Sequence, residues 1–152
     1  RRQSKDDVSY GLGYVCAFVD YHSWGQLLLP PWSYKTEFPQ DHEFQTHMTG
    51  NMTEAINKYN SLKVYRAGSN IFPSDPGTSP DWAYGMLGVR ASMTVELDPA
   101  MGGFCLPSNQ IKHVGAEQWE AIKALVAFLD EKGHEPSAYI GPWTRISSFA
   151  IL

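Results

Sequence analysis

The stretch Ala17–Tyr34, AFVDYHSWGQLLLPPWSY, contains the pattern that decides the fold. An apolar run ends in an ionisable side chain, His22, and a second apolar run is stopped by a double proline. These runs predict two strands, Tyr14–Tyr21, buried on both faces, and Gln26–Leu29. Because ligands of open α/β sheets gather beyond the carboxyl ends of strands, His22 is a candidate metal ligand or general base. A structural histidine with satisfied hydrogen bonds is the alternative.

The composition indicates one globular domain of 152 residues, with 43% hydrophobic and 18% charged side chains. The net charge is −4, and the only pair of adjacent basic residues is Arg1 and Arg2. This argues against nucleic acid or an anionic membrane as the main partner. No apolar run approaches the ~20 residues of a spanning helix, so we expect no transmembrane segment. Since the chain starts without methionine or a secretory leader, we expect a mature product or a fragment.

Helices are predicted to alternate with the remaining strands. The spacing of apolar residues predicts a helix over 39–61, whose buried stripe is Phe44, Met48, Met52, Ile56 and Tyr59. A short strand follows over 63–67. Ser79 as N-cap, Pro80 in the first turn and Gly88 as the stop predict a helix over 80–87. Together these elements predict an α/β fold with a mixed, largely parallel sheet and helices on both faces.

Two further elements complete the predicted fold. Residues 91–97 alternate, with Ala91, Met93, Val95 and Leu97 on one face and Ser92, Thr94 and Glu96 on the other. The last helix is predicted over 116–132, with an apolar stripe of Trp119, Ile122, Val126 and Leu129 and a stop at Gly133.

Glu96 is a second candidate functional residue, because it ends an otherwise apolar strand as His22 ends the first. Two strands of one sheet would then present an imidazole and a carboxylate to the same crevice. This arrangement can bind a metal and deprotonate a water on it. An ion pair with a nearby cation, or a simple strand end, is the alternative for Glu96.

Three motifs in order resemble the zinc metallocarboxypeptidases, most closely the digestive carboxypeptidase A/B subfamily. They are Ala17–Tyr34, the pair Ile71-Phe72-Pro73 and Ser79-Pro80-Asp81-Trp82, and Thr94-Val95-Glu96-Leu97 followed by Gly103-Phe104-Cys105-Leu106-Pro107. The resemblance is strongest over 15–132, and 133–152 is a divergent tail. It implies a partial catalytic domain over 1–152, the C-terminal half of a carboxypeptidase-like αβα sandwich.

The resemblance also implies roles for individual residues. His22 corresponds to a zinc ligand, and Glu96 to the general base that activates the zinc-bound water. Trp24 corresponds to an aromatic residue that lines the subsites preceding the cleaved bond, and Phe72 to the family's mobile tyrosine. Pro80 falls at the base of the pocket for the C-terminal side chain, where the lack of charge favours an apolar or aromatic residue.

The chain also departs from the family pattern. No His-x-x-Glu motif precedes His22, so the other zinc ligands and the groups that grip the substrate carboxylate are absent. One imidazole is too few for a catalytic zinc, which takes about three protein ligands. Phe72 lacks the tyrosine hydroxyl, and Asp98-Pro99 replaces the usual arginine and aspartate.

Two hypotheses follow. The first is a Zn²⁺-dependent carboxypeptidase that binds peptide C-termini, present here as a fragment inactive without its N-terminal half. The second is a non-catalytic relative that binds peptides. The family is mostly secreted, which implies an extracellular location and makes Asn51, in Asn-Met-Thr, a candidate glycan site. Cys16 and Cys105 are expected to be buried thiols, with a single disulfide as the alternative.

Overall fold

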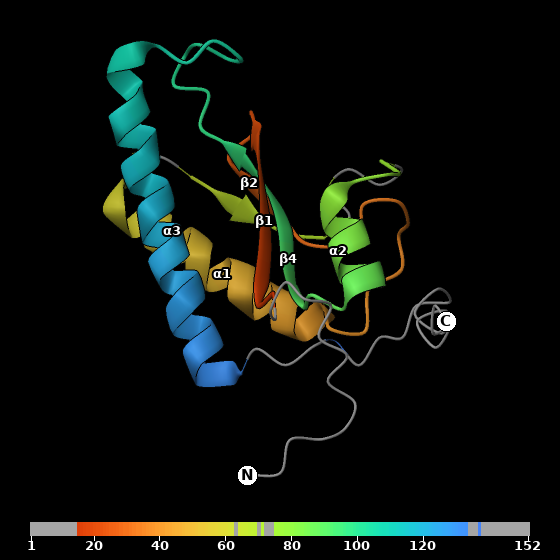
Figure 1. The fold of residues 1–152 in the computed structure, drawn as a ribbon. Helices are drawn as coiled ribbons and strands as arrows, with labels where there is room; N and C mark the ends of the chain where they lie inside the picture. Colours follow the sequence, from red (N-terminus) through yellow and green to blue (C-terminus); the bar gives the residue numbers. More distant parts are fainter. Residues whose placement is uncertain (1–14, 63, 70, 72–74, 134–136, 138–152) are drawn as a thin grey trace, which may run out of the picture.

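The computed structural model describes residues 15–62, 64–69, 71, 75–133 and 137. They contain a four-stranded sheet with the order β1 (Ala17–Ser23), β4 (Ala91–Leu97), β2 (Leu27–Leu29) and β3 (Arg66–Ala67) (Figure 1). β1 is parallel to β4 and β3 is parallel to β2, whereas β2 is antiparallel to β4. The predicted mixed, largely parallel sheet is confirmed.

Helices cover both faces of this sheet, as predicted (Figure 1). α1 (His42–Tyr59) and α3 (Ile111–Lys132) pack on each other and share one core with the strands. α2 (Ser79–Leu87) contacts β4 and β1 from the opposite face. A single 3₁₀ turn, η1 (Ser108–Gln110), leads into α3. Among the described residues, no helix is both long and apolar enough to cross a membrane.

The core lies between β4 and the α1–α3 pair. Ala91, Met93 and Val95 of β4 have no exposed surface and join the cluster that includes Met48, Met52 and Ile56 of α1. The alternate residues of β4 face α2, where Ser92 donates its hydroxyl hydrogen to the carbonyl of Pro80. The predicted alternation of β4 is confirmed.

The predicted apolar stripe of α3 is right for Leu129, which is buried, and for Ile122, which packs against the core, but wrong for its other two residues. Trp119 and Val126 are 61% and 60% exposed, and the buried face is instead Val114, Glu117, Gln118, Ala121, Leu125, Phe128 and Leu129. Each of the buried side chains Glu117 and Gln118 makes one polar contact across this face. Asn60 donates to Glu117 at 2.6 Å, and Gln118 donates to the Tyr65 hydroxyl oxygen at 3.1 Å. Because two residues of the buried face are polar, the pattern of apolar residues in the sequence did not reveal this face.

β1 is less buried than predicted. Among the described residues it pairs on one side only, with β4, and its last three residues, Tyr21–Ser23, are exposed. A strand buried on both faces needs a neighbour on each side. The strand begins at Ala17, and Tyr14 lies outside the described residues.

The ends of α2 differ at one position from the prediction. Thr78, with extended backbone, is the N-cap, and Ser79 is already helical. Gly88 adopts φ 69° and ψ 22°, and its N–H donates to Tyr84, so the predicted glycine stop is confirmed. Because the helix begins one residue earlier than predicted, Ser79 is not the N-cap. Its hydroxyl makes a different contact, in the pocket described below.

Cys16 and Cys105 are both exposed, so the prediction of buried thiols is wrong. They are not joined to each other. Cys16 precedes β1 and Cys105 follows β4, and the two strands are parallel. The two residues therefore lie beyond opposite ends of strands seven residues long, each about 3.3 Å per residue.

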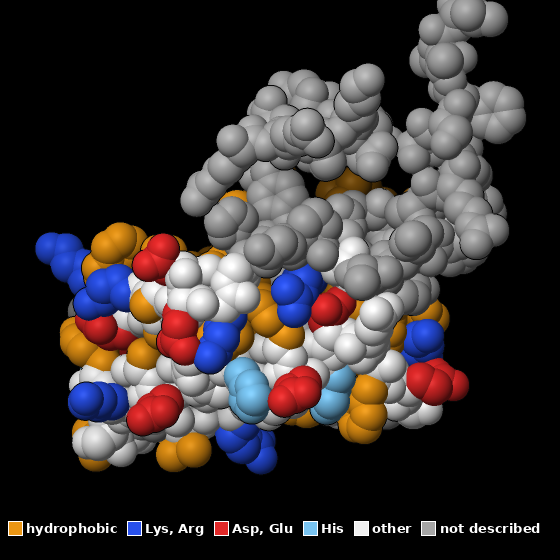
Figure 2. Space-filling model, turned by 90° about the horizontal axis from the view of Figure 1, so that it is seen from below, with side chains coloured by type: hydrophobic (Ala, Val, Ile, Leu, Met, Phe, Trp, Pro, Cys, Tyr) orange, Lys and Arg blue, Asp and Glu red, His pale blue; other side chains and the backbone are white. Residues whose placement is uncertain are grey.

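The surface charges are mixed. Figure 2 shows acidic and basic side chains interspersed over the part of this face that grey atoms leave visible. This visible face therefore carries no continuous basic surface of the kind that binds a phosphate backbone.

The Tyr65 hydroxyl gives a direct test of the polar layer under α3. It accepts hydrogen bonds from the N–H of Asp98 at 2.8 Å and from Gln118. Tyr65→Phe leaves both buried donors without this acceptor, so we expect a loss of about 1–3 kcal/mol in the free energy of unfolding, measured in urea. Tyr59→Phe, at a half-exposed tyrosine of α1, is the matched control and should stay within about 0.5 kcal/mol. Equal losses in the two variants would contradict this account.

Candidate functional site

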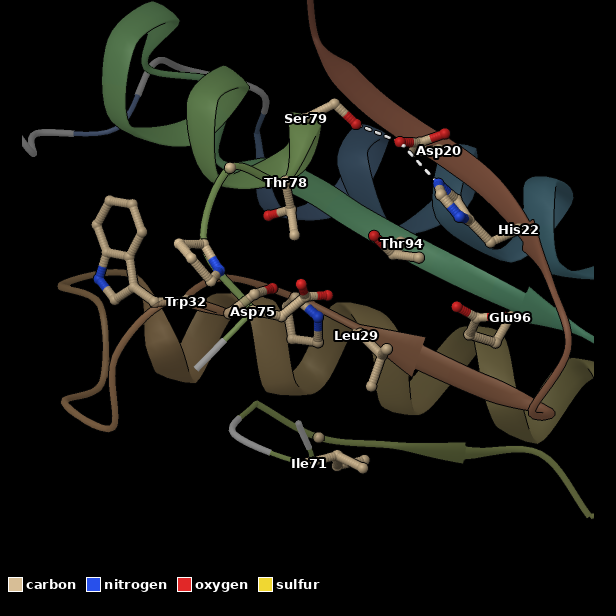
Figure 3. A pocket seen from close by; sticks show the side chains of 15 residues that line it. Asp20, His22, Leu29, Trp32, Ile71, Asp75, Thr78, Ser79, Thr94 and Glu96 are labelled. Atoms are coloured by element: carbon tan, nitrogen blue, oxygen red, sulfur yellow. Dashed lines mark hydrogen bonds and ion pairs between the residues drawn. The ribbon is translucent and has the colours of Figure 1, made fainter. Parts of the chain in front are cut away.

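A pocket of about 410 Å³ lies on the face of the sheet that α2 covers (Figure 3). β1 and β4 form one wall, and the loops around Pro30 and Gly77 form the other. The lining residues are Asp20, His22, Leu29, Pro30, Trp32, Ser33, Gly68, Ile71, Asp75, Pro76, Gly77, Thr78, Ser79, Thr94 and Glu96. The volume is that of a small-ligand site.

His22 and Glu96 meet in this pocket. They are register partners across the parallel β1–β4 pair, so their side chains leave the same face of the sheet (Figure 3). The turn after β1 passes close over Glu96, because a Cβ on Gly25 would lie 3.1 Å from the Glu96 Cβ. The N–H of Gly25 donates to the Leu97 carbonyl at 3.0 Å. A glycine at this position lets the backbone pass close to the Glu96 side chain.

Asp20 is a pocket residue that the sequence prediction missed. Its Oδ2 lies 3.1 Å from Nε2 of His22, and it also accepts the hydroxyl hydrogen of Ser79 (Figure 3). The Ser79 hydrogen bond lowers the pKa of Asp20, against a smaller opposing effect of burial, and His22 lowers it further. The position two residues before His22 on the same strand was the signal that could have revealed it.

The contact with Asp20 orients the imidazole of His22. A neutral histidine that donates from Nε2 to a carboxylate keeps the lone pair on Nδ1 for another partner. The His22 side chain is 53% exposed, so that nitrogen can meet a ligand. His22 therefore meets the local requirements of a metal ligand.

Glu96 has the environment of a base. Burial raises the pKa of Glu96; His22 lowers it, and the negative charge of Asp20 raises it again. A carboxylate with a raised pKa is a stronger proton acceptor than one in water. The site therefore combines an oriented imidazole with a carboxylate suited to proton transfer.

Asp81 holds the aromatic loop against the start of α2. It accepts hydrogen bonds from the backbone N–H of Ser33 at 2.9 Å and of Tyr34 at 3.2 Å. Burial raises the pKa of Asp81, and these two donors lower it. The adjoining Trp32 packs edge-on against Tyr84 of α2 at 4.9 Å between ring centroids. These contacts fix the wall of the pocket that faces β1.

The remaining predicted site residues lie elsewhere. Pro80 is fully buried and is not among the residues that line the pocket. Trp24 is half exposed, lies beside Gly103, and is also outside the lining. Phe72 lies outside the described residues.

The described residues do not form a complete metal site. No group of three or more His, Cys, Asp or Glu side chains among them is arranged to hold an ion. A catalytic zinc takes about three protein ligands. His22 fits one of these positions, and the other ligands have no counterpart in the described part of the chain.

The raised pKa of Glu96 predicts a pH-dependent stability. In the unfolded chain the carboxyl has a pKa of 4.5, and in the native protein its pKa is higher. The contribution of Glu96 to stability therefore falls as pH rises from 4.5 through the raised pKa. Glu96→Gln removes this loss, and we expect the unfolding free energy of the variant to rise relative to wild type between pH 4 and 7. Urea unfolding measures this, with Glu54→Gln at an exposed glutamate of α1 as control. A relative stability that falls over this range would contradict the assignment.

Comparison with known proteins places the site in a family. The sequence model of the zinc carboxypeptidases matches residues 8–121. Carboxypeptidase B of Astacus astacus is 30% identical over 133 residues, which cover 86% of this chain and 44% of the relative. Carboxypeptidase A2 of Rattus norvegicus is 36% identical over 117 residues, which cover 75% of this chain and 28% of the relative. The chain thus spans less than half the length of these relatives.

Solved structures agree. Bovine thrombin-activatable fibrinolysis inhibitor, in complex with tick carboxypeptidase inhibitor, superposes with a TM-score of 0.71 at 28% identity, covering 76% of this chain and 40% of that one. Carboxypeptidase A from Helicoverpa armigera shares the fold with a TM-score of 0.62 at 22% identity. The superposition covers 79% of this chain and 31% of that one. Because the family match extends over well more than half of the sequence, the chain belongs to the zinc carboxypeptidase family.

Proposed function

We propose that this chain is the C-terminal part of a metallocarboxypeptidase catalytic domain that removes C-terminal residues from peptides. His22 is one zinc ligand and Glu96 is the general base. The observation that carries the proposal is the register pairing of His22 with Glu96 at one wall of the pocket. An isolated His–Glu pair is often only structural. Family membership therefore gives independent support to a functional role of this pair.

Glu96 performs the proton transfers in this proposal. Its raised pKa suits a group that takes a proton from the attacking water and delivers it to the leaving amine. His22, oriented by Asp20, keeps Nδ1 available for the metal. A zinc ion, when bound, would polarise the scissile carbonyl and lower the pKa of the water.

The rest of the site would come from the N-terminal half of the domain. Among the described residues β1 has a partner on one side only, and Tyr21 on it is 43% exposed. An unpaired edge is a template for another strand. The missing half would pair with β1 and bring the remaining zinc ligands and the groups that hold the substrate carboxylate.

Substrate contacts extend beyond the pocket. Trp24 is half exposed and directly follows β1, the strand that carries the proposed metal ligand. It fits a subsite for residues that precede the cleaved bond. Phe72 would keep the hydrophobic contact of the family's mobile tyrosine without its hydroxyl, and Pro80 would support the pocket base from beneath. Secretion is proposed from family membership, and Asn51, exposed on α1, would then be a candidate glycan site.

A non-catalytic peptide-binding module is the second candidate function. Phe72, which lacks the hydroxyl of the family's mobile tyrosine, favours it. Retention of both His22 and Glu96, at matched register, favours the peptidase, because a binding module needs neither the base nor the ligand.

The isolated chain is expected to bind zinc poorly and to hydrolyse nothing, since one imidazole does not hold the ion tightly. After dialysis against buffer, metal analysis should give well below one zinc per chain, and an assay on a blocked dipeptide should show no turnover. Stoichiometric zinc together with turnover would contradict the proposed role of a missing half.

A longer form of the protein separates the two functions. If the coding region before Arg1 supplies His-x-x-Glu, Glu96→Gln in that longer form should lower kcat by about 10²–10⁴-fold with an unchanged zinc content. Glu54→Gln, which removes an exposed carboxylate of α1, should leave kcat unchanged. Full activity of Glu96→Gln, or a mature protein that begins at Arg1, would favour the binding module.

A further inference from the structure

A second pocket, of about 370 Å³, lies where α1 begins, α3 ends and β4 starts. Its lining residues are Gln40, Asp41, Glu43, Phe44, His47, Arg90, Phe128 and Lys132. It shares no lining residue with the pocket that contains Glu96. Arg90 comes immediately before β4, whereas Glu96 is near the other end of that strand. A ligand in this second pocket would therefore be separate from the peptide site proposed above.

Three contacts hold Arg90 in place at this pocket. Its Nε donates to Oδ1 of Asp41 at 2.9 Å, and its Cζ lies 3.9 Å from the centroid of the Phe44 ring. Its backbone carbonyl accepts a hydrogen bond from Gln45, a fully buried side chain of α1, at 3.2 Å. The guanidinium is therefore oriented before any ligand binds, which lowers the entropic cost of binding.

The outer end of this guanidinium is available to a ligand. The contact with Asp41 uses Nε, and within the described part of the chain neither Nη group of Arg90 has a protein acceptor. The side chain is 23% exposed, so it can be reached from the pocket. Two Nη groups on one planar guanidinium can donate in parallel to both oxygens of a carboxylate. The nearby Lys132 is less available, because its Nζ lies 2.7 Å from Oε1 of Glu131.

The acidic residues of the pocket limit the ligand to a single negative charge. Both oxygens of Asp41 are already engaged, Oδ1 by Arg90 and Oδ2 by the hydroxyls of Tyr84 and Ser137. Glu43 also lines the pocket and is exposed in the first turn of α1. Since like charges repel, these carboxylates disfavour a doubly charged phosphate. One carboxylate matches the one available guanidinium.

Two aromatic rings supply an apolar surface beside Arg90. Phe44 and Phe128 pack edge to face, with 5.1 Å between their ring centroids, and both line the pocket. Phe128 is only 3% exposed, so this part of the wall is fixed in the core. Sites for small ligands typically combine apolar walls with a few polar groups that orient the ligand.

We propose that this pocket binds a small carboxylic acid with an apolar body. Arg90 donates to both carboxylate oxygens through its Nη groups, and Phe44 and Phe128 contact the apolar body. The inference goes beyond the proposed function and does not depend on it, because the two pockets have no lining residue in common.

Three small probes test the proposal without metal or turnover. Benzoate has a carboxylate on a ring, benzamide is its neutral isostere, and acetate has the carboxylate without the ring. Isothermal titration calorimetry on the whole chain should give a dissociation constant for benzoate about tenfold or more below that for benzamide, because hydrogen bonds to charged groups are the stronger ones. Acetate should bind more weakly than benzoate, because it makes no ring contact with the two phenylalanines.

Variants of the arginine locate the binding. Arg90→Gln removes the guanidinium, so the preference for benzoate over benzamide should fall to about twofold or less. Arg90→Lys keeps the positive charge without the planar pair of donors, and the preference should fall by about threefold or more. Arg66→Gln, which removes an exposed guanidinium on β3 outside both pockets, is the matched control and should retain the preference.

Equal binding of benzoate and benzamide by the wild type overturns the proposal, as does a preference that survives in Arg90→Gln. If Arg90→Gln does not fold, an undiminished preference in Arg90→Lys overturns it. His22→Ala should retain the preference, because His22 is not part of this pocket. Loss of the preference in His22→Ala would place the acid beside Glu96 and contradict the proposal. Peptidase activity of a longer form of the protein does not affect any of these outcomes.

Discussion

The alternation of β4 is the constraint on which the other features depend. Ala91, Met93 and Val95 are completely buried in the core shared with α1 and α3, and the polar side chains of the strand face α2 and the pocket. Since side chains alternate with a period of two, a slip of one residue in the pairing would bury Glu96 and expose Met93. The hydrophobic core therefore fixes the register that brings His22 opposite Glu96.

The site is assembled from polar groups that support one another. Asp20 orients His22, Ser79 holds Asp20, and Asp81 fastens the aromatic loop to the start of α2. Asp20 and His22 lie on the same strand, whereas the contacts of Ser79 and Asp81 join segments that are distant in sequence. Buried polar groups cost free energy unless they are paired, so the helix start, the loop and the strand end stabilise each other's positions.

The fold was largely predictable from the sequence because apolar periodicity reports the buried face directly. The pattern of apolar residues was enough to predict β4, and a single glycine was enough to predict the end of α2. The buried face of α3 was misjudged because it includes Glu117 and Gln118, which form hydrogen bonds with Asn60 and Tyr65, and only the tertiary structure reveals these partners. In the site, the roles of His22 and Glu96 remain predictions, although the structure brings the two residues together. Asp20 was overlooked because its significance depends on Ser79, which approaches from another element.

The central claim is that the strand-end imidazole of His22 is a zinc ligand. The most direct measurement is X-ray absorption at the zinc edge of the metal-loaded protein that includes the N-terminal half, comparing wild type with His22→Ala. The account predicts one fewer imidazole on zinc in the variant, with the remaining protein ligands unchanged. An identical imidazole count in the two proteins would contradict it.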